Sequence, residues 1–255
     1  MKVTILGTGT SQGVPVIGCG CRTCTSQNPK DRRLRTSAYI DIDGQKLLID
    51  TSADFRQQML LNKLDDVDAV LYTHHHIDHI AGMDDLRQIN QRLDKFIDLY
   101  GNDLTMDEIS ITFRYVFDEY LINHKAVPLV NIHRIENKPF KIVNTEILPI
   151  EVIHGRLPIF GYRIHNFAYI TDASYIPEEE EHKLEGLDVL ILNALRIRPH
   201  PTHFNLEQAT ELALKYKAKK TYFTHITHDI FHDEISASLP PNIFLGYDGL
   251  TFELE

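Results

Sequence analysis

Short apolar segments that stop abruptly at a polar residue recur along the chain. They are rich in β-branched residues, and continuous apolar runs of this length are typical of buried strands. The pattern predicts strands over 3–7, 46–50, 68–73, 146–153, 167–171, 188–193 and 221–224.

Helical patterns lie between some of these predicted strands. In 205–218, Asn205 is placed to cap the start of a helix, with Gln208 three residues later. Residues 84–93 are a shorter helix candidate, and 104–121 is either helical or mixed. The helix over 205–218 places its apolar residues on one face: Leu206, Ala209, Leu212, Ala213 and Tyr216. Strands mixed with helices indicate an α/β fold, in which ligands bind in loops beyond the strand ends.

Composition narrows the class of protein. The chain has 255 residues, 43% hydrophobic and 24% charged, which is ordinary for a globular protein. No linker-like stretch or short repeat divides it, so we expect a single domain over 1–255. The net charge of −10 makes nucleic acid an unlikely partner, because nucleic-acid binding needs a basic surface.

No part of the sequence suggests a membrane or secretory protein. The opening "MKVTILGTGT" is too short an apolar run for a signal peptide, and no run approaches the roughly 18 apolar residues of a membrane span. We therefore expect a cytoplasmic protein with no membrane partner, whose three cysteines are reduced.

Residues of metal-ligand type follow several of the predicted strands. The segment "HHHIDH" (74–79) follows one strand, and three others end before His154, Asp172 and His225. His74 and His76 lie two apart, so in an extended segment they point to the same side and can share an ion, with His75 pointing away. Asp78 and His79 follow where the chain turns toward a helix. Imidazole and carboxylate ligands suit Zn, Mn or Fe.

The segment "THHHIDHIAG" resembles the signature loop of the metallo-β-lactamase superfamily, and the downstream ligand types come in that family's order. The resemblance covers essentially the whole chain. It implies a four-layer αβ/βα sandwich: two mixed sheets face each other, helices cover the outside, and the metals lie at one edge. It further implies one divalent ion (Zn or Mn) on His74, His76 and His154, and a second on Asp78, His79 and His225. Asp172 would bridge them, and Asp50 in "LLIDTS" would support the ligand loops.

Three cysteines in "GCGCRTC" form a second candidate metal site. Cys19, Cys21 and Cys24 would need a fourth ligand for a structural zinc, and His228, three residues after His225, is the candidate. A Gly-rich start followed by this cysteine triad resembles the phosphoribosyl cyclic phosphate phosphodiesterase branch of the superfamily, of the carbon–phosphorus lyase pathway type. The glycines at the start lack the spacing of a dinucleotide-binding loop.

The branch resemblance implies a binuclear phosphodiesterase that acts on a small cyclic phosphate or nucleotide-like substrate, and a possible homodimer. Two metal ions can activate a hydroxide for in-line attack on a phosphodiester. The segment "LRIRPHPTHFNLEQ" offers His200 and His203 near the leaving group, and Arg196 and Arg198 for a phosphate or ribose. We assign His203 as general acid or phosphate-stabilising donor, and Asp78 as a catalytic residue as well as a ligand.

Three other functions remain open. They are tRNA 3′ processing like that of ribonuclease Z, hydrolysis of a thioester or lactone, and a non-enzymatic metal-binding role. The acidic charge weighs against the first, and the complete set of metal positions weighs against the last. The remaining histidines lack a motif and are interpreted as surface or packing residues: His124, His133, His165, His182 and His232.

Overall fold

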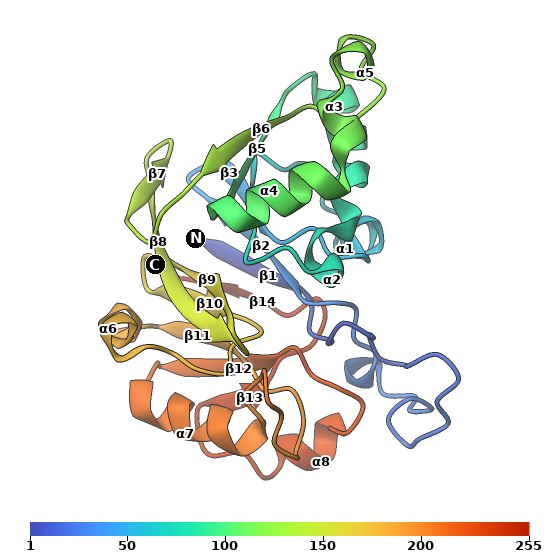
Figure 1. Ribbon diagram of the computed structural model, residues 1–255. Coiled ribbons are helices and arrows are strands. Elements are labelled where there is room, and N and C mark those ends of the chain that lie inside the picture. Colours follow the sequence, from blue (N-terminus) through green and yellow to red (C-terminus); the bar gives the residue numbers. More distant parts are fainter. Residues whose placement is uncertain (255) are drawn as a thin grey trace.

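The computed structural model describes residues 1–254. They form two seven-stranded sheets that face each other, with helices on the outer side of each sheet (Figure 1). Both sheets are mixed, with an antiparallel part and a parallel part. The predicted α/β four-layer sandwich is therefore confirmed.

The first sheet has the strand order β14-β1-β2-β3-β4-β5-β6. Its strands are β1 (Lys2–Gly7), β2 (Ser37–Ile42), β3 (Gln45–Ile49), β4 (Ala69–Leu71), β5 (Ile97–Gly101), β6 (Val130–Arg134) and β14 (Thr251–Glu253). The second sheet has the order β13-β12-β11-β10-β9-β8-β7. Its strands are β7 (Phe140–Ile142), β8 (Thr145–His154), β9 (Leu157–Ile164), β10 (Phe167–Ile170), β11 (Val189–Asn193), β12 (Lys220–Thr224) and β13 (Ile243–Leu245).

The helices cover the two outer faces (Figure 1). Those of the first half of the chain are α1 (Phe55–Asn62), α2 (Ile77–Ile80), α3 (Leu86–Leu93), α4 (Asp103–Thr112) and α5 (Glu119–Asn123). Those of the second half are α6 (Glu178–Glu181), α7 (Leu206–Tyr216) and α8 (His232–Ser236). Among residues 1–254 the longest helix, α7, has 11 residues, fewer than the roughly 20 that a helix needs to cross a membrane.

Central strands such as β3 and β11 are buried on both faces, as their continuous apolar runs predict. In β3, Leu47 and Ile49 pack into the core between the sheets, whereas Leu48 packs against the helices of the first half. In β11, Ile191 faces the inter-sheet core, and Leu192 faces the layer that contains α7. Successive side chains of a strand point to opposite faces, so one apolar run serves two cores.

The predicted helix over 205–218 and the segment 104–121, predicted as helical or mixed, can be compared with the structure. Around α7 the capping box is complete: the Asn205 side chain accepts from the Gln208 backbone N–H, and the Gln208 side chain accepts from the Asn205 N–H. The segment 104–121 is mixed rather than one helix. Helix α4 ends at Phe113, which has non-helical backbone angles, and Asp118 caps the start of a new helix, α5.

The parallel strands bring distant parts of the chain to one edge of the sandwich. β3 and β4 run parallel in the first sheet, and β10, β11 and β12 run parallel in the second. β8 runs in the same direction as β10, because each is antiparallel to β9 between them. The carboxyl ends of these strands therefore deliver the candidate ligands to a common edge. In Figure 1 it is the edge where α2 lies above and α8 below.

Asp248, in the loop before β14, connects its own segment with the segments of Thr8 and Leu34. Its carboxylate accepts hydrogen bonds from the Thr8 hydroxyl and from the Leu34 backbone N–H, both at 2.7 Å. Burial raises the pKa of Asp248 to about 7, although these two hydrogen bonds act in the opposite direction.

This raised pKa makes stability depend on pH. Above pH ~4 an unfolded chain has released the Asp248 proton, whereas the folded protein keeps it until about pH 7. The stabilisation is therefore complete below pH ~4 and is lost as pH rises through about 7. An Asp248→Asn variant keeps the acceptor oxygen but does not titrate. The free energy of unfolding of the wild type, measured relative to this variant in urea, should fall by at most about 1.4 kcal/mol per pH unit between pH ~5 and ~7. A difference that stays constant across this range would contradict the assignment.

Candidate metal centre

The histidine loop begins directly beyond β4. His74 Nε2 lies 3.0 Å from His76 Nδ1, and both rings lie beside His154, the last residue of β8. One ligand atom from each of these three residues lies within 4.8 Å of the others. The geometry thus brings together the three imidazoles that the resemblance assigns to one ion. His75 joins none of the candidate metal groups found in residues 1–254.

A second group forms where the loop enters α2. Asp78 and His79 lie in this helix, and His79 Nε2 is 3.3 Å from Asp78 Oδ2. His225, which follows β12, brings Nε2 to 3.8 Å from the same oxygen. Asp78, His79 and His225 therefore form the second predicted ligand group, and its ligand atoms too lie within 4.8 Å of one another.

Asp172 lies between the two groups. Its Oδ2 is 3.3 Å from His79 Nε2, and its Oδ1 is 3.1 Å from His225 Nε2. It also forms a candidate group with His74 and His79, so it is close to members of both ligand sets. This is the position that a bridging carboxylate requires.

Several imidazole nitrogens of the site lack a hydrogen-bond partner among the described residues and could bind a metal ion instead. His79 is buried and its Nε2 has no hydrogen-bond partner among the described residues, and the same holds for both nitrogens of buried His225. A buried polar atom is normally satisfied, and an unpartnered one is costly. Imidazole and carboxylate donors without sulfur suit Zn or Mn. The residues present therefore fit a pair of divalent ions.

Electrostatics favour cations at the same place. Burial lowers the pKa of His79, but the carboxylates of Asp172, Asp78 and Asp50 outweigh this and raise it well above its ordinary value. Burial also lowers the pKa of His74 well below its ordinary value, so this ring is neutral and has a lone pair to donate. The carboxylates that raise the pKa of His79 form a negative environment that a divalent cation can compensate in place of a proton.

Asp50 lies behind the candidate ligand loops, where it contacts Thr73 and His79. Its carboxylate accepts from the backbone N–H and the hydroxyl of Thr73, each at 2.8 Å, and lies 2.7 Å from His79 Nδ1. With Nδ1–H donating to Asp50, Nε2 of His79 is left as the ligand atom. A carboxylate behind a ligating histidine fixes its tautomer and raises its basicity.

Three residues of the site have left-handed backbone angles. Asp50 has φ 61°, Asp172 has φ 58° and His225 has φ 56°, and each follows the end of a strand. Such angles are uncommon for residues other than glycine and cluster at functional sites, where the surrounding structure holds them. At each of these three positions, the left-handed residue changes the direction of the chain at the edge of the sheet.

His203 lies over the centre from the loop before α7. Its Nε2 is 3.1 Å from Asp172 Oδ1, and its ring stacks on that of His225. Burial lowers the pKa of His203 to about 4, although the hydrogen bond to Asp172 raises it. Arg196 donates to the carbonyls of Arg198 and Pro199, so it stabilises the loop.

Thr202 is a contributor that sequence reasoning missed. Its carbonyl accepts from His154 Nδ1 at 2.8 Å, which turns Nε2 of that ring toward the centre. The close contact of Thr202 with the His154–Gly155 segment depends on Gly155, whose φ is +66°, because a Cβ there would lie 2.8 Å from Thr202 Cγ2. No local pattern signals a contact between residues this far apart in the sequence.

The cysteine triad is brought together with His228. The three thiol sulfurs lie 3.3, 3.4 and 3.5 Å from His228 Nδ1, and all four ligand atoms lie within 4.8 Å of one another. The three cysteines are free thiols. A hydrogen bond from the Cys24 backbone lowers the pKa of Cys21 to about 6, which favours the thiolate that zinc binds. The predicted structural-zinc residues therefore have suitable geometry.

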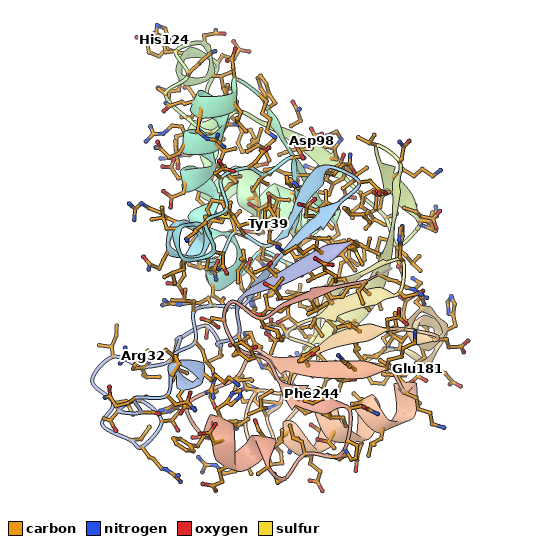
Figure 2. The ribbon with its side chains drawn as sticks, turned by 180° about the vertical axis from the view of Figure 1, so that it is seen from behind. Arg32, Tyr39, Asp98, His124, Glu181 and Phe244 are labelled. Atoms are coloured by element: carbon orange, nitrogen blue, oxygen red, sulfur yellow. The ribbon has the colours of Figure 1, made fainter. Side chains whose placement is uncertain are left out.

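The remaining histidines have local partners or lie away from the centre. His133 pairs with Asp98, and the rings of His124 and His182 contact backbone carbonyls. Figure 2 shows His124 at the far end of the layer that covers the first sheet, well away from Arg32 on the N-terminal loop.

Similar proteins share this architecture. In solved structures, a diphosphatase from the PhnP family has a TM-score of 0.92 at 43% identity, covering 98% of this chain and 96% of that one. Zinc-bound PqqB from Methylobacterium extorquens has a TM-score of 0.79 at 21% identity and covers all of both chains, which shows the shared fold.

A curated relative matches with a longer sequence. An octanoyltransferase from Porphyromonas gingivalis is 39% identical over 254 residues, which is 98% of this chain. This chain spans about half of that relative, 51% of its length. The family model described as "Beta-lactamase superfamily domain" matches residues 45–226, a range that includes all seven candidate metal ligands at the sheet edge. The chain therefore belongs to the metallo-β-lactamase superfamily, in its PhnP-like branch.

Proposed function

We propose that this protein is a binuclear metal-dependent phosphodiesterase acting on small cyclic phosphate or nucleotide-like substrates. The observation that carries the proposal is the pair of ligand groups around Asp172, whose buried imidazole nitrogens lack partners. His74, His76 and His154 would hold one ion, and a second group would hold the other, consisting of Asp78, His79 and His225. When bound, divalent ions supply Lewis-acid activation of water and of the phosphoryl group.

The protein's own side chains have separable roles in this reaction. Asp172 and Asp78 supply the carboxylates of the site, and Asp50 holds His79 in the tautomer that leaves Nε2 free. His203 brings Nε2 to 3.1 Å from Asp172 Oδ1, and we assign it as the donor to the leaving oxygen. Because burial lowers its pKa, its protonated form needs an anion nearby, which a bound phosphodiester provides.

Cys19, Cys21, Cys24 and His228 would hold a structural zinc rather than take part in the reaction. His228 lies three residues after His225 on the same loop. A zinc there would anchor the N-terminal loop to the segment that carries a catalytic ligand. Four protein ligands leave no open position on a tetrahedral zinc, as a structural site requires.

The preference for a phosphorus substrate is supported by the 43% identity to a diphosphatase from the PhnP family. A thioester hydrolase is the second candidate, because a relative matched over 98% of this chain is called an octanoyltransferase. That relative is about twice as long, so its name does not say which half carries the activity.

A substrate panel separates these candidates. It contains bis(p-nitrophenyl) phosphate, a nucleoside 2′,3′-cyclic phosphate, a dinucleoside diphosphate, an octanoyl thioester and a precursor tRNA. We expect the highest kcat/KM on a small phosphodiester. Preference for the thioester or the tRNA would replace the proposal, and preference for the diphosphate would move it to phosphoanhydrides.

Metal removal tests the centre itself. Turnover of bis(p-nitrophenyl) phosphate should cease after chelation and return when Zn or Mn is added. His76→Ala removes one ligand and should lower kcat/KM by about 100-fold or more, with less bound metal by elemental analysis. His124→Ala is the matched control and should leave both unchanged, because His124 is exposed and remote (Figure 2). Full activity in metal-free protein would overturn the binuclear mechanism.

The role of His203 is tested by the leaving group. A general acid contributes about 100-fold or more when the leaving oxygen is strongly basic. His203→Gln should therefore lose about 100-fold in kcat on the cyclic phosphate but less than about tenfold on bis(p-nitrophenyl) phosphate, whose phenolate leaves without a proton. Metal content should stay at the wild-type value. A lower metal content would make His203 a ligand instead of a donor, since His154, Asp172 and His203 also form a possible metal group.

A further inference from the structure

His203 is itself in contact with a second histidine of the same loop. His203 Nδ1 lies 3.1 Å from His200 Nδ1, and the two ring centroids are 5.0 Å apart. The opposite nitrogen of His203, Nε2, faces Asp172 and the metal centre. Two ring nitrogens at this separation form a hydrogen bond only if one of them carries a proton.

The backbone decides which of the two nitrogens is the acceptor. The Thr202 N–H donates to His200 Nδ1 at 3.3 Å, and a backbone amide has no other role than donor. Nδ1 of His200 is therefore an unprotonated acceptor. The shared proton must lie on Nδ1 of His203.

The Thr202 hydroxyl is consistent with this direction. Its Oγ1 is 2.9 Å from His203 Nδ1 and 3.2 Å from His200 Nδ1. A hydroxyl oxygen has two acceptor lone pairs, so it can accept part of the same His203 proton without competing for the lone pair of His200. With the opposite tautomer of His203, two nitrogen lone pairs would face each other at 3.1 Å.

We propose that His200 is a positioning residue that holds a proton on Nδ1 of His203, so that Nε2 is the nitrogen that gives its proton to the leaving oxygen. This inference rests on the proposed role of His203 as the donor. It assigns no contact between His200 and the substrate. The residue acts through His203.

The proton balance favours transfer from Nε2. In the protonated ring, Nδ1–H is bonded toward His200 and Thr202, and Nε2–H faces the reacting centre. When the P–O bond breaks, the leaving oxygen takes the Nε2 proton and becomes a hydroxyl group. His203 is then the neutral Nδ1–H tautomer, which its neighbours already bind, so no second proton has to move. A proton from solvent restores Nε2–H before the next turnover.

The surroundings of His200 keep it available as an acceptor. Burial lowers the pKa of His200, and the nearby Arg196 guanidinium lowers it further. Arg196 donates to the carbonyls of Arg198 and Pro199, so this cation is tied to the loop. A neutral imidazole with a free Nδ1 lone pair is the form that the hydrogen bonds require.

Two substitutions of His200 distinguish the effect of losing its acceptor nitrogen from the effect of changing its ring. His200→Phe keeps a ring of similar size but removes the acceptor, whereas His200→Asn retains an oxygen that can lie near the position of Nδ1. On a phosphodiester with an alkoxide leaving group, His200→Phe should lower kcat by about tenfold or more, and His200→Asn should restore most of the loss. On bis(p-nitrophenyl) phosphate both variants should stay within about threefold of wild type. KM and metal content should not change in either variant.

A double-variant cycle shows whether the effect passes through His203. The combined His200→Phe/His203→Gln variant should be no slower than His203→Gln alone, because residues that act as a unit are not additive. Additive losses, or equal slowing of both substrates by His200→Phe, would refute the positioning role. If His203→Gln itself shows no dependence on the leaving group, the proposed donor role fails and the fault lies in the proposed function. If only His200→Phe lacks that dependence, the donor role stands and this inference alone fails.

Discussion

The concentration of negative charge around Asp172 is the constraint on which the functional edge depends. Asp172 is buried, and its carboxylate lies within 3.3 Å of ring nitrogens from His79, His225 and His203. These rings come from three different segments, and Asp78 and Asp50 add further carboxylates. Buried charges are expensive unless they are compensated. The fold meets this by gathering imidazoles whose free nitrogens point at the same place, an arrangement that divalent cations complete.

The backbone around the centre is held in place by the rest of the fold. Asp50, Asp172 and His225 all have left-handed angles directly beyond strands, and each such residue costs about 1–3 kcal/mol. The fold tolerates this conformational free-energy cost because the strands that precede these three residues are buried on both faces. Hydrogen bonds from Thr73 and the His228–cysteine cluster add local restraint. Rigid strands thus end in short turns that aim single side chains.

Fold similarity alone does not separate the possible substrates. The chain is similar to proteins whose names describe a diphosphatase, an octanoyltransferase and a coenzyme synthesis protein. A shared fold does not fix the substrate, so function must be argued from the site's surroundings. In this chain the loop 196–204 places His203 beside Asp172 and His200 beside His203. Loops of this kind vary more readily than the sheets that hold them.

Much of the metal centre could be predicted from the sequence, because its ligands follow strong local patterns. Apolar runs predict the strands, and a polar residue at the end of a run marks a loop at the sheet edge. The spacing of His74, His76, Asp78 and His79 places four candidate ligands in one short loop. The capped start of α7 is equally local, since Asn205 and Gln208 lie three residues apart.

Several strands and the second layer of contacts were decided only by the tertiary structure. β5 and β6 are not predicted, because they alternate apolar and polar residues over five positions and lack the continuous apolar runs that predict strands elsewhere in the chain. The contact of Thr202 with His154 joins residues 48 apart, and that of Asp172 with His203 joins residues 31 apart. Sequence determines which chemical groups are available and where strands end. Which groups meet depends on how two separate sheets pack, and no local pattern encodes that.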